Sequence, residues 1–144
     1  MRLKAAVFLV AAIFLQRAEA ADQICQTWLA QDKAAKIEIY QTGETFAAKI
    51  VWLKEPDFEG NPKVDFNNPD AALRSRPVLG LVVLKNLRKS GSPNVYEGGR
   101  IYDPKNGKTY DCRITFSGDT LALRGYVLGL PLFGRTATWT AAKE

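Results

Sequence analysis

The C-terminal third of the chain, residues 98–139, consists of short runs of strand-forming residues separated by tight turns. The Asn-Gly dipeptide at 106–107 is a typical hairpin signal, and Gly118 marks a second turn a few residues later. No stretch between these turns is long enough for a helix of ordinary length. A chain that reverses direction this often predicts an antiparallel sheet or a barrel.

The residues before this region continue the pattern. Residues 24–29 predict a first short strand, while 36–41 and 45–53 predict a hairpin whose apolar side chains share one face. Residues 78–84 are apolar on both faces, which predicts a strand that is covered from both sides. The remaining expected strands are 99–102, 110–116, 121–127 and 136–140. About eight strands are enough to close a small barrel, so we expect an all-β fold built on a small antiparallel barrel.

Residues 54–77 interrupt the strand pattern with a long segment that contains four prolines. Part of this segment is expected to be helical, because Asn68 is a good N-cap and Pro69 suits the first helical position. We predict one short helix of about two turns near residues 69–75, lying across one end of the barrel. There the segment is either a lid or rim for a binding site, or a plug that covers the open end of the barrel.

The N-terminus predicts a secretory signal peptide over residues 1–20, which leaves 21–144 as a single β-barrel domain. Basic residues come first, an apolar run follows at 5–15, and Ala18-Glu-Ala20 fits the small-residue rule before a cleavage site. A membrane anchor is the alternative, but the apolar run has only about half of the roughly 20 residues that a span requires. We therefore expect a bacterial protein that is periplasmic or secreted, with no integral membrane segment after signal removal.

The expected mature chain is only mildly basic. The full chain has 20 basic and 15 acidic residues; removal of the signal leaves 17 and 14, a net charge of +3. The basic residues are dispersed, without the interleaved aromatics of a nucleic-acid-binding stripe, so nucleic acid is not an expected partner. Histidine is absent, which excludes Ser-His-Asp and Cys-His nucleophilic sites and any His-ligated metal.

The chain contains two cysteines, Cys25 and Cys112. Export points to an oxidising compartment, in which one internal disulfide is the default expectation. Two buried free thiols and an intermolecular bridge are the alternatives. Because Cys25 is three residues from Trp28, an ideal strand would place these two side chains on opposite faces. The bridge therefore requires Cys25 to lie before the strand or beside a bulge.

Five blocks of residues carry a resemblance to a known family. They are Ile50-Val51-Trp52-Leu53, Asn68-Pro69-Asp70 followed by Leu73-Arg74-x-Arg76-Pro77, Gly98-Gly99-x-Ile101-Tyr102-Asp103-Pro104, Leu123-Arg124-Gly125-Tyr126, and Phe133-Gly134-Arg135-Thr136. In this order they resemble the exported bacterial family catalogued as domain of unknown function 2147, over nearly all of the mature chain. The resemblance implies a β-barrel similar to lipocalins and fatty-acid-binding proteins, and it implies no activity.

The chain departs from this family in two places. Gln26 stands where the family usually has a glycine before Trp28. The paired cysteines that members often carry near residues 40–49 are absent, so any bridge must join Cys25 to Cys112.

The resemblance also implies roles for several structural residues. In lipocalin-like barrels a tryptophan of the first strand closes one end, and a basic side chain of the last strand lies over its ring. We therefore expect Arg135 to stack on Trp28, a contact worth roughly 0.5–2 kcal/mol. Trp139 is expected in the core of the last strand. Gly99 and Gly125 are expected at structural positions, with Gly99 at a bulge or a sharp bend.

The barrel interior gives opposing signals. Four aromatic residues favour filling, while three small residues favour residual space if they face inward; the two sets are Phe46, Trp52, Tyr110 and Phe116, and Ala48, Gly80 and Gly125. An eight-stranded barrel lies between being filled by its own side chains and holding one small ligand. The predicted ligand-contacting residues are Trp52, Tyr102, Tyr110, Arg124 and Arg135.

Two clusters of polar residues have alternative interpretations. Asp65, Asn67 and Asp70 offer oxygen ligands for calcium, or else Asp70 caps a helix and Asp65 pairs with Arg74 or Arg76. The second cluster surrounds one hairpin and allows either general acid–base catalysis or turn formation; it comprises Tyr102, Asp103, Lys108 and Tyr110. We predict no metal and no cofactor.

Three functions follow from these observations. The first is binding of a small apolar or amphipathic ligand in, or at the mouth of, the barrel. The second is a solid-core module that contacts another protein or an envelope component. The third is an enzyme that uses carboxylates. The oligomeric state is not predicted.

Overall fold

The computed structural model describes residues 22–130 and 134–143. The signal peptide expected over residues 1–20 lies outside the described residues. Within the described part of the chain, no helix is long and apolar enough to cross a bilayer.

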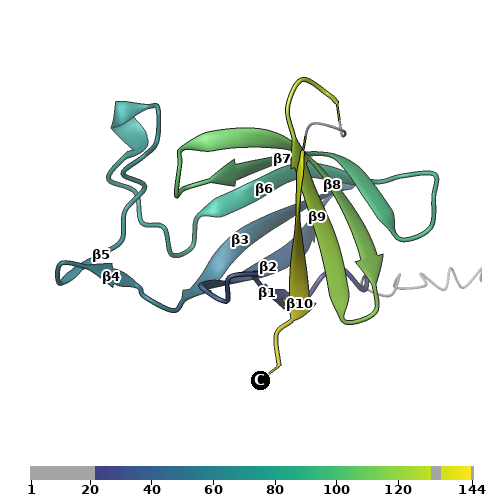
Figure 1. Cartoon of the computed structure of the whole chain (residues 1–144), viewed down its shortest axis with the longest axis horizontal. Coiled ribbons are helices and arrows are strands. Elements are labelled where there is room, and N and C mark those ends of the chain that lie inside the picture. The colour runs from purple at the N-terminus through teal and green to yellow at the C-terminus, as the bar shows by residue number, and fades with distance from the viewer. Residues whose placement is uncertain (1–21, 131–133, 144) are drawn as a thin grey trace, which may run out of the picture.

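Eight antiparallel strands close into a barrel (Figure 1). Their order around the barrel is β1-β10-β9-β8-β7-β6-β3-β2. They are β1 (Thr27–Leu29), β2 (Ala35–Thr42), β3 (Thr45–Leu53), β6 (Val82–Lys89), β7 (Val95–Asp103), β8 (Lys108–Ser117), β9 (Thr120–Tyr126) and β10 (Arg135–Ala141). Closure occurs where β1 pairs with β10, with Trp28 opposite Ala141. The expected eight-stranded barrel is confirmed.

Alternation of apolar and polar residues forms the core, because successive side chains of a strand point to opposite faces. In β2, Ile37 and Ile39 are buried, and in β8 the same holds for Ile114 and Phe116. Trp139 of β10 is also buried, as expected from the sequence.

One end of the barrel is filled by side chains. Trp28 is fully buried, its ring packs edge-on against Phe116 at 6.0 Å, and its indole N–H donates to the carbonyl of Ile24 at 3.0 Å. Phe46 and Tyr96 make a second edge-on pair at 5.4 Å. These rings lie at the end that carries the β2–β3, β6–β7 and β8–β9 turns, so this end is closed.

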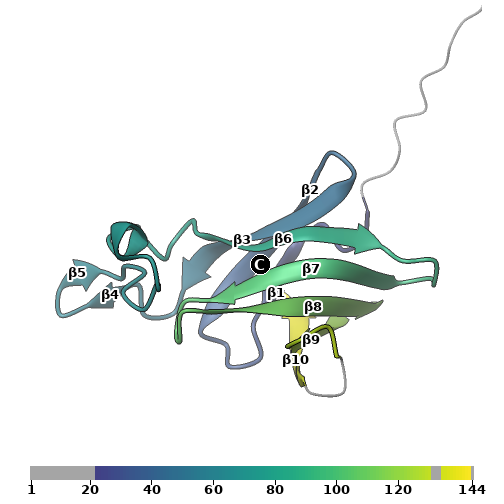
Figure 2. The ribbon, with the colours of Figure 1, turned by 90° about the horizontal axis from the view of Figure 1, so that it is seen from above.

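The β3–β6 insertion, residues 54–81, projects beyond the barrel (Figures 1 and 2). It contains a small two-stranded sheet, β4 (Asp57–Phe58) with β5 (Asn61–Pro62), and a 3₁₀ helix, η1 (Ala71–Leu73). The expected two-turn helix over 69–75 is thus shorter and begins later.

The N-cap of η1 is Asp70, whose carboxylate accepts from the backbone N–H of Ala72 at 3.0 Å. Asn68, the cap expected from the sequence, instead accepts from the N–H of Asp70 at 2.8 Å. After the helix, the carbonyl of Arg76 accepts from the N–H of Asp65, next to the bridge between Val64 and Pro77, so the chain has left the helical conformation there.

Gly98 and Gly99 form the expected bulge. The register of β7 against β8 shifts between Tyr96 and Gly99, and Gly98 has a φ of 75°. Gly99 faces the core, where an added Cβ would lie 2.9 Å from a methyl of Leu87. Both positions therefore require glycine, one for its backbone conformation and one for space.

The expected disulfide is not formed, and both thiols are free. Cys25 precedes β1 and lies beside β2, whereas Cys112 lies in β8 between Gly99 of β7 and Gly125 of β9. Strands β9 and β10 separate β8 from β1, so the two sulfurs face different parts of the barrel. Burial raises the pKa of Cys112 to about 12.

Candidate ligand-binding cavity

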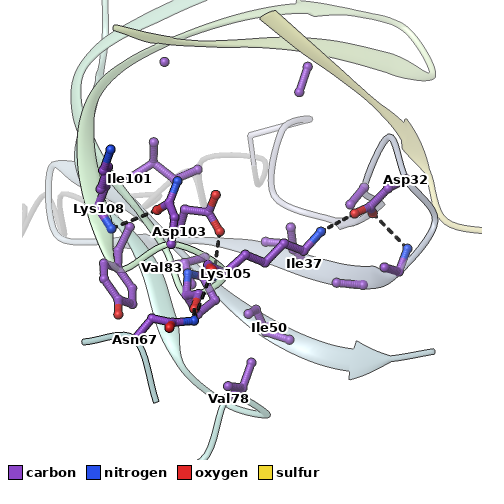
Figure 3. Close-up of a pocket in the computed structure, with 18 of the residues that line it drawn as sticks. Asp32, Ile37, Ile50, Asn67, Val78, Val83, Ile101, Asp103, Lys105 and Lys108 are labelled. Atoms are coloured by element: carbon purple, nitrogen blue, oxygen red, sulfur yellow. Dashed lines mark hydrogen bonds and ion pairs between the residues drawn. The ribbon is translucent and has the colours of Figure 1, made fainter. Parts of the chain in front are cut away.

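An open cavity of about 1560 Å³ extends from the other end of the barrel to the β3–β6 insertion. Its wall includes inward-facing apolar side chains from six strands, namely Ile37, Ile50, Val83, Ile101, Leu123 and Trp139. Figure 3 shows the first four of them. We call this end the mouth; it is formed by residues 30–34, the β3–β6 insertion, the β7–β8 turn at 104–107 and the start of the β9–β10 connection. The barrel is therefore filled at one end and hollow at the other.

Three of the predicted ligand-contacting residues line this cavity: Tyr102, Tyr110 and Arg135. Their role in binding stays a prediction. Ala137, with its small side chain, and Gly125, which has none, leave space on the same wall.

The structure corrects the position of two other predicted ligand-contacting residues, Trp52 and Arg124, and their role in binding stays a prediction. A register shift between Lys36 and Ile37 turns Trp52 to the outer face, where the Lys36 ammonium lies 5.3 Å from its ring centroid. Arg124 also points outward and donates to the hydroxyl of Thr136 at 2.9 Å. Neither Trp52 nor Arg124 lines the cavity.

The expected stack of Arg135 on Trp28 is also corrected. Trp28 of β1 pairs with Ala141, the last residue of β10. Arg135 is the first residue of β10 and lies opposite Gly125 of β9. Ala141 is six positions after Arg135 along this extended strand, which corresponds to about 20 Å. Trp28 therefore closes one end of the barrel, and Arg135 lies at the mouth.

Of the small residues expected to leave space, only Gly125 lies on the cavity wall. Ala48 is fully buried in the core, and Gly80 sits in an exposed turn with a φ of 87°. Phe46 and Phe116 fill the closed end, as expected for large aromatic side chains that face the interior.

The buried carboxylate of Asp65 joins the β3–β6 insertion to the barrel. Asp65 is fully buried and accepts from the Tyr102 hydroxyl at 2.5 Å and from the Asn68 amide and Arg76 guanidinium at 2.8 Å each. Burial raises its pKa, but these donors and the charge of Arg76 outweigh burial and hold the pKa below its ordinary value. The expected ion pair of Asp65 with Arg76 is confirmed.

The polar residues of the β7–β8 hairpin form its turn. Asp103 accepts from the backbone N–H of Lys105, and Asn106 accepts from that of Lys108, each at 2.9 Å. The Asn106 amide also donates to the Tyr110 hydroxyl at 2.9 Å. The turn interpretation of this cluster is confirmed, and its carboxylate is engaged in backbone bonding.

The insertion also fixes the position of this turn. The amide of Asn67 donates to the carbonyls of Pro104 and Lys105 at 3.2 and 3.0 Å. Gly107, with a φ of 73°, packs so closely that an added Cβ would lie 1.9 Å from the Asn67 carbonyl oxygen. The insertion thus lines and braces the mouth, and the plug considered from the sequence is not formed.

Two functional candidates at the mouth were missed by sequence reasoning. The ammonium of Lys105 pairs with the carboxylate of Asp32, which lies 73 positions earlier in the chain (Figure 3). No local pattern joins these residues, because only closure of the barrel brings them together.

The surface around the mouth is unusually apolar. The exposed large apolar residues among those described are Val51, Trp52, Phe58, Val64, Phe66, Leu73, Leu79, Val127, Leu128 and Leu130. All of them belong to the end of β3, the β3–β6 insertion or the residues that follow β9. Exposed apolar side chains that are concentrated in a few segments in this way are typical of binding sites.

Comparisons with known proteins agree with this architecture. A family model described as "Uncharacterized protein conserved in bacteria (DUF2147)" matches residues 26–141. The chain is similar to the solved structure of protein HP1028 from the human pathogen Helicobacter pylori, which is described as belonging to the lipocalin family. That similarity has a TM-score of 0.73 and 25% identity, covering 85% of this chain and 84% of the other. No curated protein matches this chain.

Proposed function

The chain belongs to the DUF2147 family of uncharacterized bacterial proteins, and we propose that it binds one small apolar or amphipathic ligand in its barrel. The observation that carries this proposal is the open apolar cavity at one end of a barrel that is closed at the other. The similarity to a lipocalin-family structure supports the proposal at the level of the fold.

The hydrophobic effect supplies the driving force for such binding. Burial of each methylene group contributes about 0.8 kcal/mol. A chain of eight buried methylenes thus gains about 6 kcal/mol before the loss of its own freedom is subtracted. The open cavity of about 1560 Å³, which includes the space beside the β3–β6 insertion, has room for one ligand of this kind.

The signal peptide predicted from the sequence supports a location outside the cytoplasm. We propose that the ligand is an envelope molecule of the bacterium, met in the periplasm or after secretion. An amphiphile of low solubility would benefit from a carrier there, since its apolar part is removed from water inside the barrel.

A second candidate function is docking on another envelope component, and the apolar surface around the mouth favours it. Phe58, Phe66 and Leu128 are 68%, 75% and 88% exposed. The solid core assumed for this alternative is absent at the mouth end, where the cavity lies. A carboxylate-based enzyme is disfavoured because Asp65 and Asp103 are engaged in structural hydrogen bonds.

Native mass spectrometry tests the proposal. The chain is purified from bacterial cells without detergent, and its mass is measured before and after denaturation. We expect an adduct of lipid-like mass that is lost on denaturation. The neutral apolar dye Nile red is then added to the delipidated protein and should gain fluorescence. Absence of both the adduct and dye uptake would contradict ligand binding and favour the docking function.

A further inference from the structure

We propose that the ligand carries an anionic head group, and that this head group replaces Asp32 as the ion-pair partner of Lys105 at the mouth. This inference rests on the proposed function and specifies its ligand class: an alkyl chain that ends in a carboxylate or a phosphate.

The ion pair of Lys105 and Asp32 crosses the mouth. Asp32 lies in the loop between β1 and β2, and Lys105 lies in the turn between β7 and β8. In the order of the closed barrel, four strand positions separate these connections in either direction, so they face each other across the opening. Figure 3 shows the Lys105 side chain extended toward Asp32 beside the cavity residues Ile37 and Ile50.

Lys105 is held in this position by its own backbone. Its N–H donates to Asp103 at 2.9 Å, and its carbonyl accepts from the Asn67 amide at 3.0 Å. Asn67 belongs to the insertion that the buried Asp65 anchors to Tyr102. The ammonium is therefore presented at the mouth by a braced turn, which reduces the entropy lost when an anion binds it.

Asp32 is the internal anion that a ligand head group would replace. Its carboxylate also accepts from the N–H of Ala34 at 2.9 Å, which fixes its orientation. A ligand that parts the ion pair on entering the cavity leaves Lys105 without a partner. An anionic head group restores that partner, and a neutral head group does not, so the mouth discriminates between them.

Two further cations lie near the entrance. Lys108 is two residues before Tyr110 in β8, and Arg135 is two residues before Ala137 in β10, so each lies on the same inward face of its strand as a cavity residue. Among the described residues, neither Lys108 nor Arg135 has an ion-pair partner. In the part of the chain that the structure describes, four basic and three acidic side chains line the cavity. Lys105 pairs with Asp32 and Lys63 pairs with Glu55, so Lys108 and Arg135 are the two lining cations outside an ion pair. These two cations are therefore available to an anionic head group at the entrance.

The experiment compares ligands that share one chain and differ in the head group: dodecanoate, dodecyl phosphate and methyl dodecanoate. Binding is measured by displacement of Nile red from the mature protein at neutral pH, below the micellar concentration of each ligand. The variants are Lys105→Gln and Asp32→Asn. Lys54→Gln is the control, because it removes the same charge close to the mouth from a residue that does not line the cavity.

We expect the wild-type protein to bind dodecanoate about fivefold more tightly than its methyl ester. Lys105→Gln should reduce this ratio to about one, while Lys54→Gln leaves it unchanged. Asp32→Asn, which retains the acceptor for Ala34, should raise the affinity for dodecanoate about threefold. A stronger preference for dodecyl phosphate would identify the head group as a phosphate.

Two results would overturn the inference. An unchanged ratio in Lys105→Gln, with Nile red and all three ligands still bound, would refute the role of Lys105 and leave the cavity function standing. An equal loss in Lys105→Gln and Lys54→Gln would assign the preference to the general field of the mouth. Failure of Nile red and the methyl ester to bind any form would instead refute the proposed function itself.

Discussion

The hydroxyl of Tyr102 donates a 2.5 Å hydrogen bond to the fully buried carboxylate of Asp65, 37 positions earlier in the chain. This bond joins β7 of the barrel to the β3–β6 insertion. Because Asn67 of the same insertion holds the turn that carries Lys105, the bond contributes to the architecture of the mouth.

Loss of this bond should destabilise the protein. Tyr102→Phe removes one of the three side-chain donors to Asp65, and a buried acceptor left unsatisfied costs about 1–3 kcal/mol. We expect the free energy of unfolding in urea to fall by that amount. The control is Tyr40→Phe, because Tyr40 contacts Lys49 through its ring. Equal stability of Tyr102→Phe and Tyr40→Phe would contradict the role of the bond.

Acid should destabilise the fold through Asp22 and Asp65, whose pKa values lie below the ordinary 3.8. At both sites burial raises the pKa, but hydrogen bonds and a cationic partner lower it by more. A carboxylate whose folded pKa is depressed stabilises the protein above its unfolded pKa, and this contribution is lost as the pH falls through the folded pKa. Stability should therefore decline below about pH 4. Urea titrations of Asp65→Asn should show a shallower decline; an identical one would refute the assignment.

Alkali should destabilise the fold through groups with raised pKa values. Burial and the bond to Asp65 raise the pKa of Tyr102 from 10.0 to about 12. Such a phenol stabilises the protein below its unfolded pKa, and its contribution is lost as the pH rises through the folded value. Stability should fall between about pH 10 and 12, with Cys112 and Tyr96 acting in the same direction. Tyr102→Phe should reduce the slope of this fall, and an unchanged slope would contradict the prediction.

The separation of Trp28 from Arg135 has a direct consequence for stability. Trp28→Ala removes a fully buried ring that packs on Phe116, and we expect a loss of about 3–5 kcal/mol. Arg135→Ala changes an exposed side chain at the mouth, and its effect on unfolding should stay within about 0.5 kcal/mol. Thermal and urea unfolding measure both. A loss of several kcal/mol in Arg135→Ala would restore the stack expected from the sequence.

The two cysteines should both react with alkylating reagents once the protein is unfolded. In the folded state Cys25 is partly accessible, while Cys112 is fully buried. We expect one adduct to appear first under native conditions, located at Cys25 by peptide mapping, and two adducts in denaturant without reductant. A protein that takes up no reagent in denaturant until it is reduced would instead contain the bridge.

Much of the barrel could be predicted from the sequence, because alternation and turn dipeptides are local signals. The regular run from Tyr110 to Phe116 and the turn at Asn106 and Gly107 are examples. Asp70 as a helix cap and the ion pair of Asp65 with Arg76 could be predicted for the same reason, because both partners are near in the chain.

The candidate site was less predictable, because it depends on register and closure. One register shift opposite Lys36 turns Trp52 away from the interior, although simple alternation places it with Phe46 and Ile50. Which end of the barrel is filled depends on where each strand begins relative to its neighbours. That register also separates Trp28 from Arg135 and brings Asp32 to Lys105.

The central claim is that the cavity at the mouth holds an apolar ligand, and the most direct test compares two neighbouring residues of β10. Ala137 lines the cavity, and Thr138 is exposed on the outer face. We expect Ala137→Phe to reduce the affinity for Nile red at least about tenfold by filling the cavity, while Thr138→Phe binds as the wild type does. Equal dye binding by Ala137→Phe and Thr138→Phe, with both variants folded, would contradict the claim.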